Sequence, residues 1–93
     1  MEVHDLLLEV QEEIKRAGKA HGPLTQNHQD ASLILCRESL EALQEAGEMK
    51  SIPVLSPEYI AKRMKLRAEL IQVIAVAALW IGNIDRARGK EGG

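Results

Sequence analysis

The segment that decides the fold is Leu70–Gly82, LIQVIAVAALWIG, in which Gln72 is the one strongly polar side chain. A helix that is apolar around its whole circumference packs against protein on every side. A glutamine amide inside such a helix needs hydrogen-bond partners or a ligand. Glu69 stands one helical turn before Gln72, so the two side chains point in the same direction. The segment therefore predicts a packed central helix with a polar pair at its beginning.

The composition is typical of a single small helical domain. Apolar residues make up 45% of the 93 positions, but Phe is absent, so Leu, Ile, Val and Ala must build the core. The net charge is −2, whereas a nucleic-acid-binding protein normally carries a basic excess. The apolar segment is shorter than the roughly 18–20 residues of a membrane-spanning helix. The N-terminal residues lack the features of a signal peptide, and one cysteine cannot form an internal disulfide. We therefore expect a soluble cytoplasmic protein that binds neither membranes nor nucleic acid.

Periodic apolar residues predict two helices in the first half of the chain. The first is expected over residues 2–19, where apolar residues recur three and four positions apart. The second is expected over residues 29–46, capped by Asn27 or Asp30 and terminated by Gly47. Gly and Pro between the two segments exclude one continuous helix.

The third predicted helix is the longest. Ser56 is a suitable N-cap and Pro57 a suitable first helical residue, so the helix should begin there and run to residue 84 or beyond. We expect residues 1–87 to form one all-α domain, an antiparallel bundle of three main helices. Residues 88–93 are expected to be a disordered tail.

The second helix carries two apolar stripes on opposite sides. The stripe expected to enter the core consists of Leu33, Cys36, Leu40 and Leu43. A weaker stripe consists of Ala31, Ile34, Leu35 and Ala42. Glu38 projects on the weaker side and Glu41 lies at its border, so this acidic pair is expected to border packed protein.

Two helices cannot easily cover a third that is apolar all round. The remaining surface is expected to meet another copy of the chain, which predicts a homodimer or homotetramer whose helices complete a larger bundle.

Two polar pairs at i, i+3 spacing carry the chemistry: Glu38-x-x-Glu41 and Glu69-x-x-Gln72. Each pair lies on one helical face, and antiparallel packing would bring the two pairs together. Three carboxylates in a low-dielectric interior repel one another unless a cation neutralises them. Oxygen ligands favour Mg²⁺, with Mn²⁺ as an alternative, and protein-bound Mg²⁺ commonly takes substrate phosphates as further ligands.

These residues resemble the MazG-type all-α nucleoside triphosphate pyrophosphohydrolases, whose signature is E-E-x-x-E followed on a later helix by E-x-x-D. The counterpart segments here are Arg37–Glu41 and Glu69–Gln72, separated by 27 residues. RAELIQVIAVAALWIGNID looks like the third helix of short phage-type members, and KAHGPLTQNHQDA looks like the loop before their metal-binding helix. The resemblance covers roughly residues 12–86.

The resemblance implies an enzyme that hydrolyses a (d)NTP to a monophosphate and pyrophosphate. Glu38, Glu41 and Glu69 would be the catalytic and metal-binding carboxylates, Gln72 the fourth ligand, and Glu38 the favoured general base. Arg37 and Gln72 depart from the signature by removing negative charge, which lowers the expected metal affinity. The alternative is a non-catalytic helical interaction module that retains the fold with a degenerate metal site.

Several basic residues are candidates for substrate binding. Lys62 and Lys65 lie on the same helical line as Glu69 and could reach phosphates, although Lys65 could instead pair with Glu69. Lys15 is a weaker candidate of the same kind. His28, together with His21, lies in the first loop near the expected nucleotide entrance.

Overall fold

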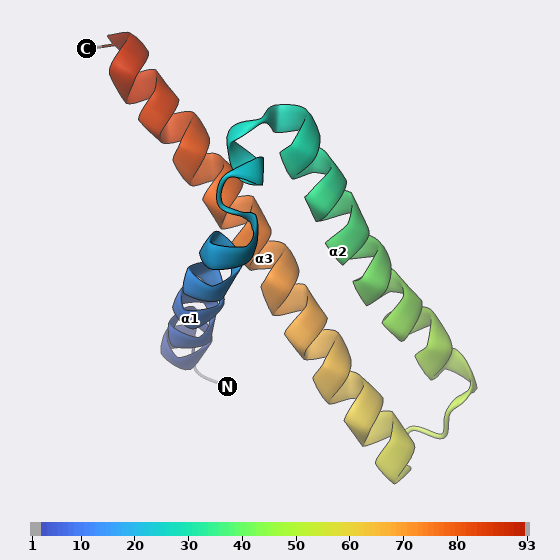
Figure 1. Ribbon diagram of the computed structural model, residues 1–93. Helices are drawn as coiled ribbons and strands as arrows, with labels where there is room; N and C mark the ends of the chain where they lie inside the picture. The colour runs from blue at the N-terminus through green and yellow to red at the C-terminus, as the bar shows by residue number, and fades with distance from the viewer. Residues whose placement is uncertain (1–2, 93) are drawn as a thin grey trace.

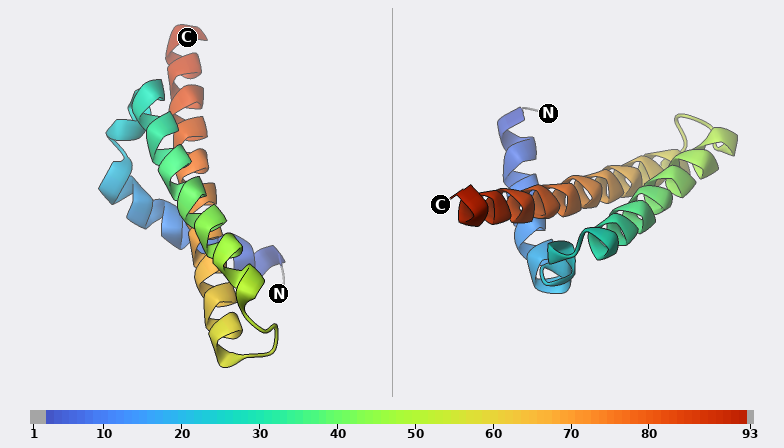
Figure 2. Two further views of the ribbon diagram at one scale, coloured as in Figure 1. Left: turned by 90° about the vertical axis from the view of Figure 1, so that its right-hand side faces the viewer. Right: turned by 90° about the horizontal axis from the view of Figure 1, so that it is seen from above.

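Helices α2 and α3 lie antiparallel, and α1 crosses α3 steeply on one side of this pair (Figure 1, Figure 2). The elements are α1 (Val3–His21), η1 (Leu24–Gln26), α2 (His28–Glu48), η2 (Met49–Ser51) and α3 (Pro57–Gly92). The computed structural model describes the backbone of residues 3–92 and the side chains of residues 3–87. The predicted all-α class is confirmed, and the antiparallel arrangement holds for α2 and α3, whereas α1 packs across them.

Side-chain caps fix the beginnings of the two long helices. The Asn27 side chain accepts hydrogen bonds from the backbone N–H groups of Gln29 and Asp30, at 2.8 and 3.2 Å. Asn27 is therefore the cap of α2, one of the two predicted alternatives. The backbone N–H of Tyr59 donates to Ser56 Oγ at 3.1 Å, so α3 begins at the predicted Ser-Pro pair.

The connection from α1 to α2 is attached to the C-terminal half of α3. Asn83 Nδ2 donates to Thr25 Oγ1 at 2.7 Å, and the buried Thr25 hydroxyl donates to the carbonyl of Gly22 at 2.8 Å. Only glycine fits at position 22, because a Cβ there would lie 2.4 Å from the carbonyl oxygen of Gly18. These contacts fix where α1 ends and hence how it lies over the other helices.

The core stripe predicted for α2 was wrong. The residues of α2 that are buried are Ala31, Ile34, Glu38, Ala42 and Glu45, which belong to the side of the weaker stripe. The stronger stripe is exposed: Leu33 retains 68% of its accessible surface and Leu43 67%, and Cys36 is also exposed. The two stripes lie on opposite sides of one helix, and α3 packs only against the side that carries Glu38.

Two predicted helix ends also differ. Helix α2 continues past Gly47 to Glu48, because Gly47 keeps a negative φ and does not form the left-handed turn that ends many helices. Helix α3 continues to Gly92, so the backbone of residues 88–92 is helical where the sequence predicted a tail. The last residue lies outside the described part of the chain.

Helix α3 has one buried side and one exposed apolar side. Ile71, Ala75 and Val76 are buried, whereas an exposed stripe follows the opposite side of the same helix at Leu70, Ile74, Ile81 and Ile84. The single chain therefore leaves one side of α3 uncovered, and the expectation that another copy meets this surface stays a prediction. Over the described residues, no helix is long and apolar enough to cross a membrane.

Candidate metal centre

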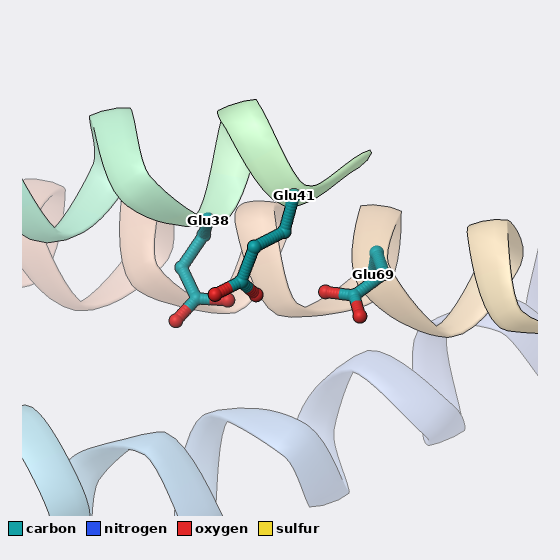
Figure 3. A group of neighbouring side chains, drawn as sticks. All are labelled: Glu38, Glu41 and Glu69. Atoms are coloured by element: carbon teal, nitrogen blue, oxygen red, sulfur yellow. The ribbon is translucent and has the colours of Figure 1, made fainter. Parts of the chain in front are cut away.

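Three glutamates from two helices converge where α2 and α3 pack together (Figure 3). Glu38 and Glu41 extend from α2 and Glu69 from α3, and one carboxylate oxygen from each lies within 4.8 Å of the other two. We refer to these three residues as the acidic cluster. The convergence of the two polar pairs that the sequence predicted is therefore observed for all three carboxylates.

The helical register explains why these charges are brought inside. The side of α2 that faces α3 carries the buried residues Ala31, Ile34 and Ala42. Glu38 lies on the same side of the helix, between Ile34 and Ala42. Glu38 retains only 8% of its accessible surface, while Glu41 and Glu69 are half-buried. Small alanines let the two helices approach closely, which leaves the carboxylates facing one another.

The acidic cluster is electrostatically unfavourable as it stands. Burial, followed by the negative charge of Glu41, raises the pKa of both Glu38 and Glu69 above the ordinary value of 4.5. The Oε2 atoms of Glu38 and Glu69 are buried, and within the described part of the chain neither has a hydrogen-bond partner. Buried oxygens normally have hydrogen-bond partners. These two Oε2 atoms can therefore still accept a hydrogen bond or bind a cation.

A cleft of about 250 Å³ lies between α1 and the acidic cluster, and we call it the α1 cleft. Its polar lining residues are Glu13, Arg16, His21, Glu38 and Gln72. Its apolar lining residues are Ala17, Ala20 and Val76. Gln72, the predicted fourth ligand, thus shares the cleft with Glu38. His21 also lines the cleft, but as the last residue of α1 rather than as a loop residue.

Glu13 and Arg16 are cleft residues that the sequence analysis did not identify. Arg16 Nη2 donates to both carboxylate oxygens of Glu13, at 2.7 and 2.6 Å. The signal was their helical register, since positions 13, 16, 17 and 20 share one flank of α1 and Ala17 is buried.

The predicted phosphate-binding lysines lie in a different environment. Lys62 Nζ lies 3.4 Å from Glu45 Oε2 and 2.5 Å from Glu48 Oε2, and Lys65 Nζ lies 2.9 Å from Glu45 Oε1. The hydrogen bond from Lys65 is the largest cause of a lowered Glu45 pKa. These ion pairs join α2 to α3, and Lys65 pairs with Glu45 rather than with the predicted Glu69.

The remaining predicted residues have local partners. Lys15 lies 3.5 Å from Glu12 on the exposed side of α1. Trp80 Nε1 donates to His28 Nδ1 at 2.8 Å, so His28 contacts α3 at the beginning of α2. Arg37 lies 4.0 Å from Glu38 and is itself exposed. None of these three residues lines the α1 cleft.

The residues of the acidic cluster fit a hard divalent cation. Carboxylate oxygens are the ligands that Mg²⁺ and Mn²⁺ prefer, and the two buried Oε2 atoms have capacity for such a ligand. Glu38, Glu41 and Glu69 would hold the ion. The chain matches no protein-family model, no curated protein and no solved structure. The function is therefore inferred from the residues of the acidic cluster and the α1 cleft.

Proposed function

We propose that the protein is a metal-dependent nucleoside triphosphate pyrophosphohydrolase that hydrolyses a (d)NTP between its α and β phosphates. The observation that carries the proposal is the convergence of Glu38, Glu41 and Glu69 beside a cleft that also has a cationic residue, Arg16. The resemblance of the two glutamate motifs to the MazG-type enzymes supports the same reaction class.

Each residue of the acidic cluster has a role in this proposal. Mg²⁺ bound by the cluster would neutralise phosphate charge and lower the pKa of the attacking water. Glu38 is the proposed general base, because it is the carboxylate of the acidic cluster that lines the α1 cleft. Water adds across the phosphoanhydride bond, the proton passes to Glu38, and the products are a nucleoside monophosphate and pyrophosphate.

A second candidate is a non-catalytic interaction module with the same fold. This candidate is favoured by Arg37 and Gln72, because the MazG-type signature has an acidic residue at each of these two positions. Arg37 also lies 4.0 Å from Glu38, where its positive charge opposes cation binding. Calorimetric titration with Mg²⁺ and a non-hydrolysable nucleotide separates the candidates. The enzyme should bind both ligands, whereas a degenerate module should bind neither.

The exposed apolar stripes support self-association as part of this proposal. The chain has an accessible surface of 6727 Å² and a mass of 10.3 kDa. A monomer of that mass typically exposes about 5,400 Å², so roughly 1,350 Å² is in excess. Two protomers would then cover about 2,700 Å² between them, which lies in the range of obligate homodimers.

The position of the acidic cluster makes the exposed apolar stripe on α2 the preferred contact between two copies of the chain. The stripe of Leu33, Cys36, Leu40 and Leu43 lies opposite the acidic cluster on the same helix. A dimer formed there would leave the α1 cleft accessible to substrate. The stripe on α3 would be available for a further pairing into a tetramer.

A further inference from the structure

The α1 cleft has a carboxylate on one side and a guanidinium on the other. Glu38 and Gln72 lie on the side formed by α2 and α3. The α1 side has Arg16 with its ion-pair partner Glu13, and also His21. A site for a metal cation alone needs only the acidic side. A ligand that pairs a cation with an anion would use both sides, and a metal-bound polyphosphate is such a ligand.

The geometry of Arg16 suits recognition of an anion. Its contact with Glu13 is made through Nη2, and the planar guanidinium carries further N–H groups on Nη1 and Nε. The Glu13 side chain is 16% exposed whereas that of Arg16 is 69% exposed. A largely buried carboxylate therefore holds an accessible guanidinium beside the cleft. Arginine held in this way can form paired hydrogen bonds with phosphate oxygens.

The acidic side provides an independent sign of a ligand. Glu38 is more than nine-tenths buried and lines the α1 cleft. Its Oε2 atom has no hydrogen-bond partner among the residues that the structure describes. The Glu38 carboxylate on one side and the Arg16 guanidinium on the other distinguish the cleft from a packing gap between apolar side chains.

The size of the cleft limits which part of a nucleotide it can take. Sites that enclose a whole small-molecule ligand usually measure about 300–1,000 Å³, and this cleft measures about 250 Å³. The polar groups at the cleft are two carboxylates, a guanidinium, an imidazole and an amide, whereas its apolar wall consists of Ala17, Ala20 and Val76. The cleft therefore suits the phosphates of a ligand better than its base and sugar.

We infer that the α1 cleft recognises the polyphosphate part of the substrate, with Arg16, positioned by Glu13, binding a phosphate oxygen while the acidic cluster holds the metal. This inference rests on the proposed function and specifies which part of the substrate is recognised. Arg16 takes the role that the sequence analysis gave to Lys62 and Lys65, which pair with Glu45 instead. Inorganic triphosphate, which lacks base and sugar, should then bind in the presence of Mg²⁺.

The test is a calorimetric titration of the full chain with inorganic triphosphate in the presence of Mg²⁺. Arg16→Gln should weaken triphosphate binding about 10- to 100-fold, the range expected for charge-assisted hydrogen bonds. Arg16→Lys should recover part of the loss. Lys50→Gln removes the same charge at an exposed position in η2, away from the cleft, and should change affinity less than twofold. Binding of Mg²⁺ without triphosphate should be unchanged in Arg16→Gln.

A spectroscopic readout separates direct contact from a general charge effect. The Nε–Hε resonance of Arg16 in ¹⁵N-labelled protein should shift when triphosphate is added with Mg²⁺, and should not shift with Mg²⁺ alone. Equal weakening by Arg16→Gln and Lys50→Gln, or no triphosphate binding by the unaltered chain, would overturn the inference.

The same variants distinguish a failure of this inference from a failure of the proposed function. Arg16-dependent triphosphate binding without release of pyrophosphate from nucleotides would support the inference and contradict the enzyme. Pyrophosphate release with the same KM in Arg16→Gln as in the unaltered chain would support the enzyme and contradict the inference.

Discussion

Glu38 of α2 and Glu69 of α3 each bury one carboxylate oxygen, Oε2, that has no hydrogen-bond partner within the described residues. The two residues come from antiparallel helices and share the negative charge of Glu41 as a neighbour. This relationship makes the acidic cluster costly for the folded chain by itself and favourable for a cation.

The metal-free protein should lose stability as the pH rises. The pKa values of Glu38 and Glu69 are raised in the folded chain, so the folded state binds protons more tightly than the unfolded state. Their contribution to stability is therefore full below the ordinary value of 4.5 and is lost as pH rises through the raised pKa values. Thermal unfolding in EDTA between pH 4 and 7 should show this decrease.

Mg²⁺ should oppose that loss, because a ligand that binds only the folded state stabilises it. Unfolding curves at pH 7 should move to higher temperature as Mg²⁺ is added in excess of EDTA. Identical pH profiles with and without Mg²⁺ would contradict cation binding by the acidic cluster.

Glu69→Gln should separate stability from function. The amide keeps the shape of the side chain and removes a charge that repels Glu41, so the metal-free protein should gain about 1 kcal/mol at pH 7. The same change should abolish turnover. Glu12→Gln, on the exposed side of α1, is the matched control and should alter neither property. A less stable Glu69→Gln protein would show that this carboxylate has a structural partner.

The ion pairs between α2 and α3 should stabilise the fold without contributing to substrate binding. Glu45→Gln removes the carboxylate that lies near both Lys62 and Lys65. The variant should unfold at a lower temperature, and high salt should reduce the difference from the unaltered chain. Nucleotide KM should be unaffected. A change in KM with an unchanged melting temperature would instead indicate that Lys62 and Lys65 bind phosphate.

The exposed stripe on α2 should control self-association. Leu40→Glu places a charge in the middle of a stripe whose leucines are at least half exposed in the single chain. We expect light scattering after gel filtration to give a dimer or tetramer for the unaltered chain and a smaller species for the variant. Ser32→Glu, also exposed on α2 but outside the stripe, is the control. A monomeric unaltered chain would exclude the interface.

Much of the secondary structure and of the acidic cluster could be predicted from the sequence. Ser56-Pro57 and Asn27 mark helix beginnings through local hydrogen bonds, so no tertiary information was needed there. The i, i+3 spacing of the glutamates placed each pair on one face, and antiparallel packing then brought Glu38, Glu41 and Glu69 together.

The errors arose where local pattern does not determine tertiary partners. Helix α2 has two apolar stripes, and periodicity cannot tell which one faces α3 and which remains exposed. The partner of Lys65 depends on how α2 and α3 are aligned, which brings Glu45 within reach. Arg16 could not be assigned to the cleft from the sequence, because the crossing of α1 over the acidic cluster depends on tertiary contacts such as that of Thr25 with Asn83.

The most direct test of the central claim is a product-resolved screen of nucleoside triphosphates with and without Mg²⁺. The unaltered chain should produce a nucleoside monophosphate and pyrophosphate only when Mg²⁺ is present, and Glu69→Gln should produce neither. Release of orthophosphate would contradict the proposed reaction. No Mg²⁺-dependent product from any triphosphate would contradict the enzyme and favour the interaction module.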